Sequence, residues 1–180
     1  NHKVLVKITK YPQKGKKAEG KIIEVLGNVN EAGVDMLSLI KEYKLPSTFP
    51  EPVVNEAIKC GNKIKKEDLK DRRDLRKEII FTIDGDDAKD LDDAVKVSKM
   101  KNGNYKLDVH IADVSNYVRE NTLLDQEALL RGTSIYMLGR VIPMLPRELS
   151  NGICSLNAGE DRLTLSCSME IDNKGNVVSS

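Results

Sequence analysis

A run of carboxylates between residues 84 and 93 is the strongest chemical feature of the sequence. Six of these ten residues are aspartates: Asp84, Asp86, Asp87, Asp90, Asp92 and Asp93. Two unit charges about 4 Å apart repel by roughly 4 kcal/mol at an effective dielectric constant of about 20. A folded protein therefore needs solvent, raised pKa values or bound cations to compensate for such crowding. Carboxylate oxygens suit Mg²⁺, Mn²⁺ or Ca²⁺.

The acidic run has two interpretations: a solvated surface loop or a metal site. It follows the most apolar run of the chain, residues 79–83, and small apolar residues such as Ala88 and Leu91 are interleaved with the aspartates. Asp90 and Asp92 are two positions apart, so on an extended chain their side chains point to the same side. These details favour the metal site.

Two other enzyme or metal motifs fit the run less well. A haloacid dehalogenase-type phosphohydrolase would use Asp84 as nucleophile and Asp86 as general acid, but it needs Thr or Val where Asp87 stands. An EF-hand is excluded, because its loop has an oxygen ligand and a glycine at the positions of Ala88 and Lys89.

The N-terminal part predicts two strands followed by two helices. Apolar residues alternate over residues 4–8 and recur over 20–26, and a lysine-rich loop at 13–17 joins the two strands. Residues 35–43 and 53–60 have helical spacing, with prolines and glycines at the expected ends. Two strands alone are marginal in water, so we expect this fold to begin before the chain does.

The middle of the chain predicts a sheet that ends at the acidic run. Residues 62–78 are dense in charge and predict a solvated helix or a linker, with the domain boundary here, and the apolar residues 79–83 predict a buried strand. An Asn-Gly turn within 101–104 joins strands expected at 94–97 and 105–111.

The C-terminal part predicts one helix and one strand. Thr122 begins a capping box, and Gly132 is a typical helix end. Residues 133–150 contain two prolines and predict more loop than helix, whereas 162–171 alternate as a strand. A turn at 173–176 has no completed return strand, so we expect the chain to end within a fold as well.

Composition excludes several classes of protein. No apolar run approaches the roughly 20 residues that span a bilayer, and no signal-peptide pattern opens the chain. The three cysteines, Cys60, Cys154 and Cys167, form no CxxC pair, which argues against a disulfide scaffold or zinc module. Their small number predicts a cytoplasmic location.

The charge is distributed unevenly along the chain. Residues 1–80 carry 18 basic and 12 acidic residues, a net +6, whereas 81–180 carry 11 and 16, a net −5. This asymmetry suits a polyanion-binding surface beside a cation site.

Several motifs together resemble the ribonuclease II/ribonuclease R (RNB) family of exoribonucleases, and most of all its ribonuclease R branch. The resemblance rests on Thr82-Ile83-Asp84 with residues 87–95 (DAKDLDDAV), and on residues 109–115 (VHIADVS), 131–136 (RGTSIY), 142–146 (IPMLP) and 154–156 (CSL). The motifs come in the family's order and spacing.

The resemblance implies an α+β fold in three parts. Residues 1–60 would be the end of a cold-shock (OB-type) β-barrel with a helical connector. A charged linker would follow at 61–78. Residues 79–180 would form the first part of a mixed-sheet α/β RNB catalytic domain. The chain would then be a fragment, inactive alone, because the family's later catalytic arginine and glutamate would lie beyond Ser180.

The resemblance also implies a reaction. The family hydrolyses RNA processively from the 3′ end and releases nucleoside 5′-monophosphates with Mg²⁺, for which Mn²⁺ is a possible substitute. Asp84, Asp90 and Asp93 would hold one metal ion, and Asp92 would be the most critical for catalysis, by helping to place a second. Such a metal pair suits phosphodiester hydrolysis. No small-molecule cofactor is expected.

The expected partner is single-stranded RNA, bound at its 3′ end. The residue alone, between Ile135 and Met137, favours a core position for Tyr136, but the resemblance implies that it is the family's stacking tyrosine. Candidate contacts to the RNA backbone are Lys14, Lys16, Lys17 and Lys21, for which a solvated loop is the alternative. A non-catalytic RNA-binding module also stays open as an alternative to the enzyme.

Overall fold

In the computed structural model, which describes residues 1–180, the alternating apolar residues at the N-terminus form two antiparallel strands. These are β1 (His2–Lys10) and β2 (Glu19–Asn28), paired from His2 opposite Asn28 to Lys10 opposite Glu19. Both strand predictions are confirmed. The sheet has two strands only, so apolar side chains such as Ile22 stay more than half exposed.

Helix α1 (Val34–Glu42) packs against β2 and confirms the first predicted helix. It buries Val34 and Ile40. Gly27 makes this close approach possible: a Cβ at this position would lie 2.6 Å from Cγ2 of Val34, and its φ of 137° disfavours other residues.

A second short sheet consists of β5 (Ile135–Met137) and β6 (Arg140–Ile142). Only residues 147–150 of the segment 133–150 are helical, so the prediction of more loop than helix is confirmed. It missed these two strands, because three-residue strands are too short to show a clear alternation. Residues 1–48 and 136–142 form one unit of the structure, and residues 49–135 and 143–180 form another.

The core of the second unit lies around two helices. Helix α2 (Glu51–Cys60) begins with Pro52 in its first turn, and α3 (Leu123–Arg131) begins at the predicted cap, where the Thr122 hydroxyl accepts a hydrogen bond from the Asp125 amide. Both helix predictions are confirmed. The two helices pack together around Val53, Ala57, Leu124, Leu145, Leu149, Ile153 and Cys154.

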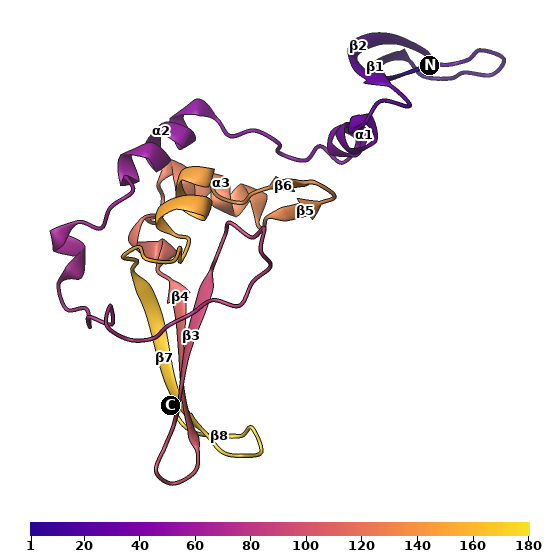
Figure 1. Ribbon diagram of the computed structural model, residues 1–180. Helices are drawn as coiled ribbons and strands as arrows, with labels where there is room; N and C mark the ends of the chain where they lie inside the picture. The colour runs from indigo at the N-terminus through magenta and orange to yellow at the C-terminus, as the bar shows by residue number, and fades with distance from the viewer. The chain divides into compact units, whose positions relative to one another are not determined.

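The same unit contains a four-stranded antiparallel sheet in the order β3-β4-β7-β8 (Figure 1). Its strands are β3 (Asp93–Lys99), β4 (Tyr105–Ala112), β7 (Thr164–Ile171) and β8 (Val177–Ser179). β3 and β4 form the predicted Asn-Gly hairpin. Three short helical turns complete the fold: the 3₁₀ turns Lys66–Leu69 and Val114–Asn116, and the π-helical turn Leu149–Ile153.

The predicted buried strand at residues 79–83 is wrong. Only Phe81 pairs with a neighbour: its amide and carbonyl exchange hydrogen bonds of 3.1 and 2.9 Å with Val95. Ile79 and Ile83 are 83% and 81% exposed. An apolar run becomes a buried strand only where other elements cover it, and no element covers this one on both faces.

Candidate active site

The acidic loop, residues 84–93, leads directly into β3. Asp93 is the first residue of this strand and pairs with Ile111 of β4. The Ala112 amide donates a 2.9 Å hydrogen bond to the carbonyl of Asp92. The backbone of the last two aspartates is thus fixed to the end of the sheet, and their side chains point to alternate sides.

The second half of the loop is also bound to residues 155 and 156. The Leu91 amide donates to the Ser155 hydroxyl at 3.1 Å, and this hydroxyl donates to the Lys89 carbonyl at 2.9 Å. The Leu156 amide donates to the Leu91 carbonyl at 2.8 Å. Ser155 lies within a motif that the sequence singles out, but only the structure reveals these contacts.

The first half of the loop is held less firmly. Within residues 84–88, the backbone forms a single turn contact, in which the Ala88 amide donates to the Gly85 carbonyl at 3.0 Å. Asp84 and the two aspartates at the turn, Asp86 and Asp87, are exposed. The loop therefore has an exposed half, 84–88, and an anchored half, 89–93.

The four aspartates of the predicted site share one electrostatic environment. The pKa of Asp92 is raised, first by the desolvation of its carboxyl and then by the negative charges of Asp90, Asp93 and Asp84. Asp92 is exposed at the surface, but the atoms crowded around its carboxyl still disfavour the charged form. A bound cation would relieve this repulsion.

The donor set suits a hard divalent cation, since it consists of carboxylate oxygens alone. The four side chains do not yet form a metal cage, because no three acidic, histidine or cysteine side chains of the chain are grouped closely enough to hold an ion. Assembly would need side-chain rotation, which the exposed half of the loop allows. The assignment of Asp84, Asp90, Asp92 and Asp93 to a metal site stays a prediction.

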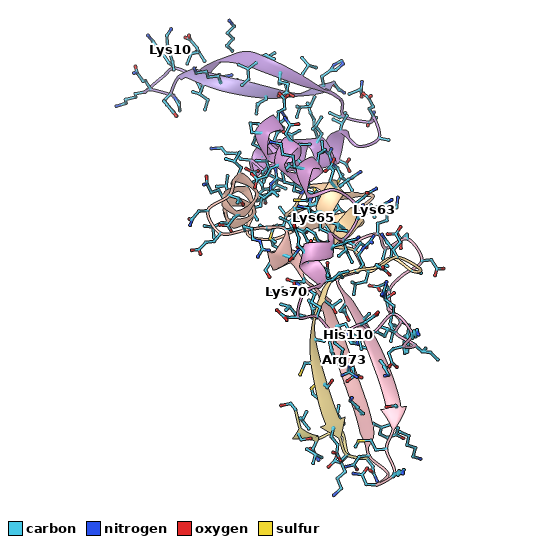
Figure 2. The ribbon with its side chains drawn as sticks, turned by 90° about the vertical axis from the view of Figure 1, so that its left-hand side faces the viewer. Lys10, Lys63, Lys65, Lys70, Arg73 and His110 are labelled. Carbon is cyan, nitrogen blue, oxygen red and sulfur yellow. The ribbon has the colours of Figure 1, made fainter.

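The predicted RNA contacts lie in the first unit. Tyr136 is in β5 and is 65% exposed, so it is not a core tyrosine. Lys14, Lys16 and Lys17 lie in the exposed connector beyond Lys10, which Figure 2 labels at the end of β1, and Lys21 lies on β2 opposite Lys7. Exposure makes these side chains accessible to RNA, and their roles stay predictions.

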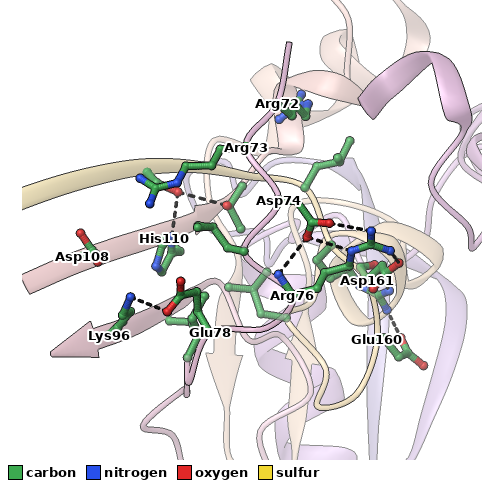
Figure 3. Close-up of a pocket in the computed structure, with 18 of the residues that line it drawn as sticks. Arg72, Arg73, Asp74, Arg76, Glu78, Lys96, Asp108, His110, Glu160 and Asp161 are labelled. Carbon is green, nitrogen blue, oxygen red and sulfur yellow. Dashed lines mark hydrogen bonds and ion pairs between the residues drawn. The ribbon is translucent and has the colours of Figure 1, made fainter. Parts of the chain in front are cut away.

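A cavity of about 1100 Å³ lies elsewhere in the second unit, between the segment 71–82 and the sheet (Figure 3). None of the four aspartates lines it. Its charged groups are mostly paired with each other, as in the 2.7 Å pairs Arg76–Asp74 and Lys96–Glu78. The predicted site in the acidic loop is therefore separate from this cavity.

His110 and Arg73 both line this cavity (Figure 3). The Nδ1 of His110 is 2.7 Å from the Ser166 hydroxyl, and Nε2 is buried without a partner. Burial lowers the pKa of His110 and favours the neutral ring. The histidine is thus a strand residue outside the acidic loop.

Comparison with known proteins identifies the family. Residues 72–180 match the RNB domain, and residues 1–50 match a cold shock domain. The chain belongs to the RNB family. The RNB match contains the whole acidic loop, so it replaces the haloacid dehalogenase-type interpretation, and the predicted order of a cold-shock part before an RNB part is confirmed. The two matches leave residues 51–71 unassigned, and the predicted linker at 61–78 stays a prediction.

Relatives of this RNB chain are named ribonuclease R. The Thermotoga maritima protein is 54% identical over 180 residues, which cover 99% of this chain and 25% of that protein. The Escherichia coli protein is 44% identical over 174 residues, covering 97% and 21%. The chain therefore spans a quarter or less of the length of these two relatives.

Solved structures agree with this assignment. Mycoplasma genitalium RNase R in complex with double-stranded RNA superposes with a TM-score of 0.89 at 31% identity, covering 99% of this chain and 32% of that one. The complex of the same enzyme with ribose-methylated single-stranded RNA gives 0.88 at 31% identity, covering 99% and 28%. Yeast Ssd1, a pseudonuclease, shares the fold at 20% identity with a TM-score of 0.68, covering 97% and 22%. No helix of the RNB chain has the length and apolarity to span a membrane.

Proposed function

We propose that this chain supplies part of a Mg²⁺-dependent, processive 3′–5′ exoribonuclease that releases nucleoside 5′-monophosphates. The observation that carries the proposal is the electrostatic coupling of Asp84, Asp90 and Asp93 to Asp92 in a loop bound to the end of a sheet. The named relatives support the reaction class.

Each aspartate has a role in the proposed mechanism. Asp84, Asp90 and Asp93 hold one Mg²⁺, and Asp92 helps to place a second. When bound, the metal pair neutralises the scissile phosphate, stabilises the leaving oxygen and activates the attacking water. The anchored backbone at residues 89–93 fixes the positions from which the side chains of Asp90, Asp92 and Asp93 extend. Asp84 contributes the remaining ligand from the exposed half of the loop.

The proposed substrate is RNA, held by its 3′ end. The solved relatives that contain RNA support this substrate class. Tyr136 stacks on a base near the 3′ end, and Lys14, Lys16, Lys17 and Lys21 contact backbone phosphates. Such stacking tolerates any base, because every base has a π face. The three free cysteines fit a reducing, cytoplasmic setting.

The direct test is the direction and product of RNA cleavage. We define the chimeric ribonuclease as the Thermotoga maritima ribonuclease R in which this chain replaces the matching segment. With Mg²⁺ and single-stranded RNA labelled at the 5′ end, we expect a ladder that shortens progressively and released 5′-monophosphates. An RNA that binds but stays intact would instead support the non-catalytic RNA-binding module.

A further inference from the structure

The hydroxyl of Ser155 joins two backbone groups that flank one predicted metal ligand. It donates to the Lys89 carbonyl at 2.9 Å and accepts from the Leu91 amide at 3.1 Å. Asp90 lies between these two residues. The hydroxyl of Ser155 therefore links the backbone before Asp90 to the backbone after it.

These two bonds suit a hydroxyl better than any other small group. A serine hydroxyl has one hydrogen to donate and lone pairs to accept with, so a single atom satisfies both backbone groups. The Asn157 side-chain oxygen, at 3.2 Å, is a longer alternative acceptor for the same hydrogen. Ser155 is 0% exposed, so solvent has no access to take the place of its hydroxyl.

The backbone of Ser155 is itself held in place by Arg162. The Arg162 guanidinium donates to the Ser155 carbonyl at 2.7 Å and to the Gly152 carbonyl at 3.2 Å. The Leu156 amide donates to the Leu91 carbonyl at 2.8 Å. The hydroxyl therefore belongs to a rigid segment that grips residues 89–91 of the loop.

We propose that Ser155 is a positioning residue for the metal site: it fixes the backbone on both sides of Asp90 and so presents this carboxylate, with Asp92 beyond it, to the divalent cation. This role rests on the proposed function. A metal ligand whose backbone is mobile must become ordered when the cation binds, and this loss of conformational entropy weakens binding. The Ser155 hydroxyl orders the backbone in advance, so cation binding carries less of this entropic cost.

The Ser155→Ala variant of the chimeric ribonuclease tests the proposal. Groups that support metal ligands typically contribute 10- to 100-fold to metal affinity or activity. Because Ser155 acts through the backbone, we expect the Mg²⁺ concentration for half-maximal hydrolysis to rise by about tenfold. High Mg²⁺ should restore much of the rate, and affinity for RNA in a gel shift without metal should not change.

Three comparisons separate positioning from a purely structural role. Ser155→Thr keeps a hydroxyl and should return the Mg²⁺ midpoint toward that of the parent, even if its added methyl lowers thermal stability. Leu124→Ala removes a buried side chain that does not belong to the loop, and it should lower the melting temperature without moving the Mg²⁺ midpoint. Ser166→Ala removes the hydrogen bond to His110 and should also leave the midpoint unchanged.

The outcomes distinguish this proposal from the proposed function. If Ser155→Ala keeps the parent's Mg²⁺ midpoint, or if Leu124→Ala shifts the midpoint equally, the positioning role is wrong while the nuclease assignment stands. If the unsubstituted chimeric ribonuclease binds RNA but does not hydrolyse it, the proposed function fails and the positioning role fails with it.

Discussion

The amide of Ala112, the last residue of β4, donates a 2.9 Å hydrogen bond to the carbonyl of Asp92, the residue just before β3. The hairpin thus extends its ladder by one bond into the acidic loop. This backbone bond holds Asp92 near the other aspartates of the loop, although their negative charges repel its carboxylate. The stability of the sheet and the geometry of the site are therefore linked.

The Arg72–Asp113 pair should contribute strongly to stability. Arg72 donates to the Asp113 carboxylate at 2.5 Å, and the Asp113 side chain is only 4% exposed. Removing one partner leaves a buried charge unpaired, so we expect Arg72→Met to lower the free energy of unfolding by about 3 kcal/mol. Denaturant unfolding of the chain measures this. Arg76→Met, which breaks the exposed Arg76–Asp74 pair, is the control; equal losses in both variants would contradict the account.

Asp113 should also make stability depend on pH. Burial raises its pKa, but hydrogen bonds from Ser115 and Arg72 outweigh burial, and the pKa lies below its ordinary value. Its contribution is therefore present above the ordinary carboxyl pKa of about 3.9 and is lost as the pH falls through the lowered value. The stability difference between the parent and Asp113→Asn should shrink in that acidic window. A difference that persists unchanged under acid would show that Asp113 is not the group responsible.

The cysteines should differ in reactivity. Cys154 is buried, whereas Cys167 is exposed. Burial raises the pKa of Cys154 to about 12, with a smaller contribution from the negative charge of the Cys60 thiolate. The thiolate is the reactive form. At pH 8 we expect iodoacetamide to modify Cys167 first and Cys154 only after unfolding, as read by peptide mass spectrometry. Rapid modification of Cys154 in the folded chain would mean that its packing differs from this structure.

Tyr136→Ala in the chimeric ribonuclease should change the length of the final product. The lost stacking is worth about 1–3 kcal/mol and matters most for the shortest oligomers, which have few other contacts. Tyr136→Phe keeps the aromatic face and is the matched control. An end-product ladder that is the same for the alanine variant and the parent would argue against stacking by Tyr136.

The 180-residue chain alone should have no processive exonuclease activity. Transition-state stabilisation needs charged donors as well as metals, and the chain spans a quarter or less of the two relatives described above. It should bind Mn²⁺ weakly, and RNA weakly with strong salt dependence. Stepwise release of mononucleotides by the purified chain, abolished by Asp92→Asn, would show that it contains a complete site.

Local signals in the sequence predicted much of the fold. The alternation in β1, the capping box at Thr122 and the Asn-Gly turn before β4 each depend on neighbours in the chain, and each is confirmed. The run 79–83 was misjudged because burial depends on what covers a strand, which apolarity alone does not reveal. The short strands β5 and β6 gave no periodic signal.

The candidate site was only partly predictable for the same reason. The aspartates are neighbours in sequence, so their crowding was visible without a structure. Ser155 lies 64 positions from Leu91, and no local pattern links a serine to so distant a loop. Residues 154–156 belong to a motif of the RNB family, but their contacts with the loop depend on how the chain folds.

The central claim is that the acidic loop hydrolyses RNA, and the Asp92→Asn variant of the chimeric ribonuclease tests it most directly. Asparagine keeps the shape of the side chain but removes the charge, while RNA affinity comes mainly from basic surfaces elsewhere. A degradation assay beside a gel shift, with Asp86→Asn as the matched control at the exposed turn, gives both readouts. We predict that Asp92→Asn abolishes hydrolysis and leaves RNA binding nearly unchanged, whereas Asp86→Asn retains both. Hydrolysis by Asp92→Asn above a few per cent of the parent rate would contradict the account.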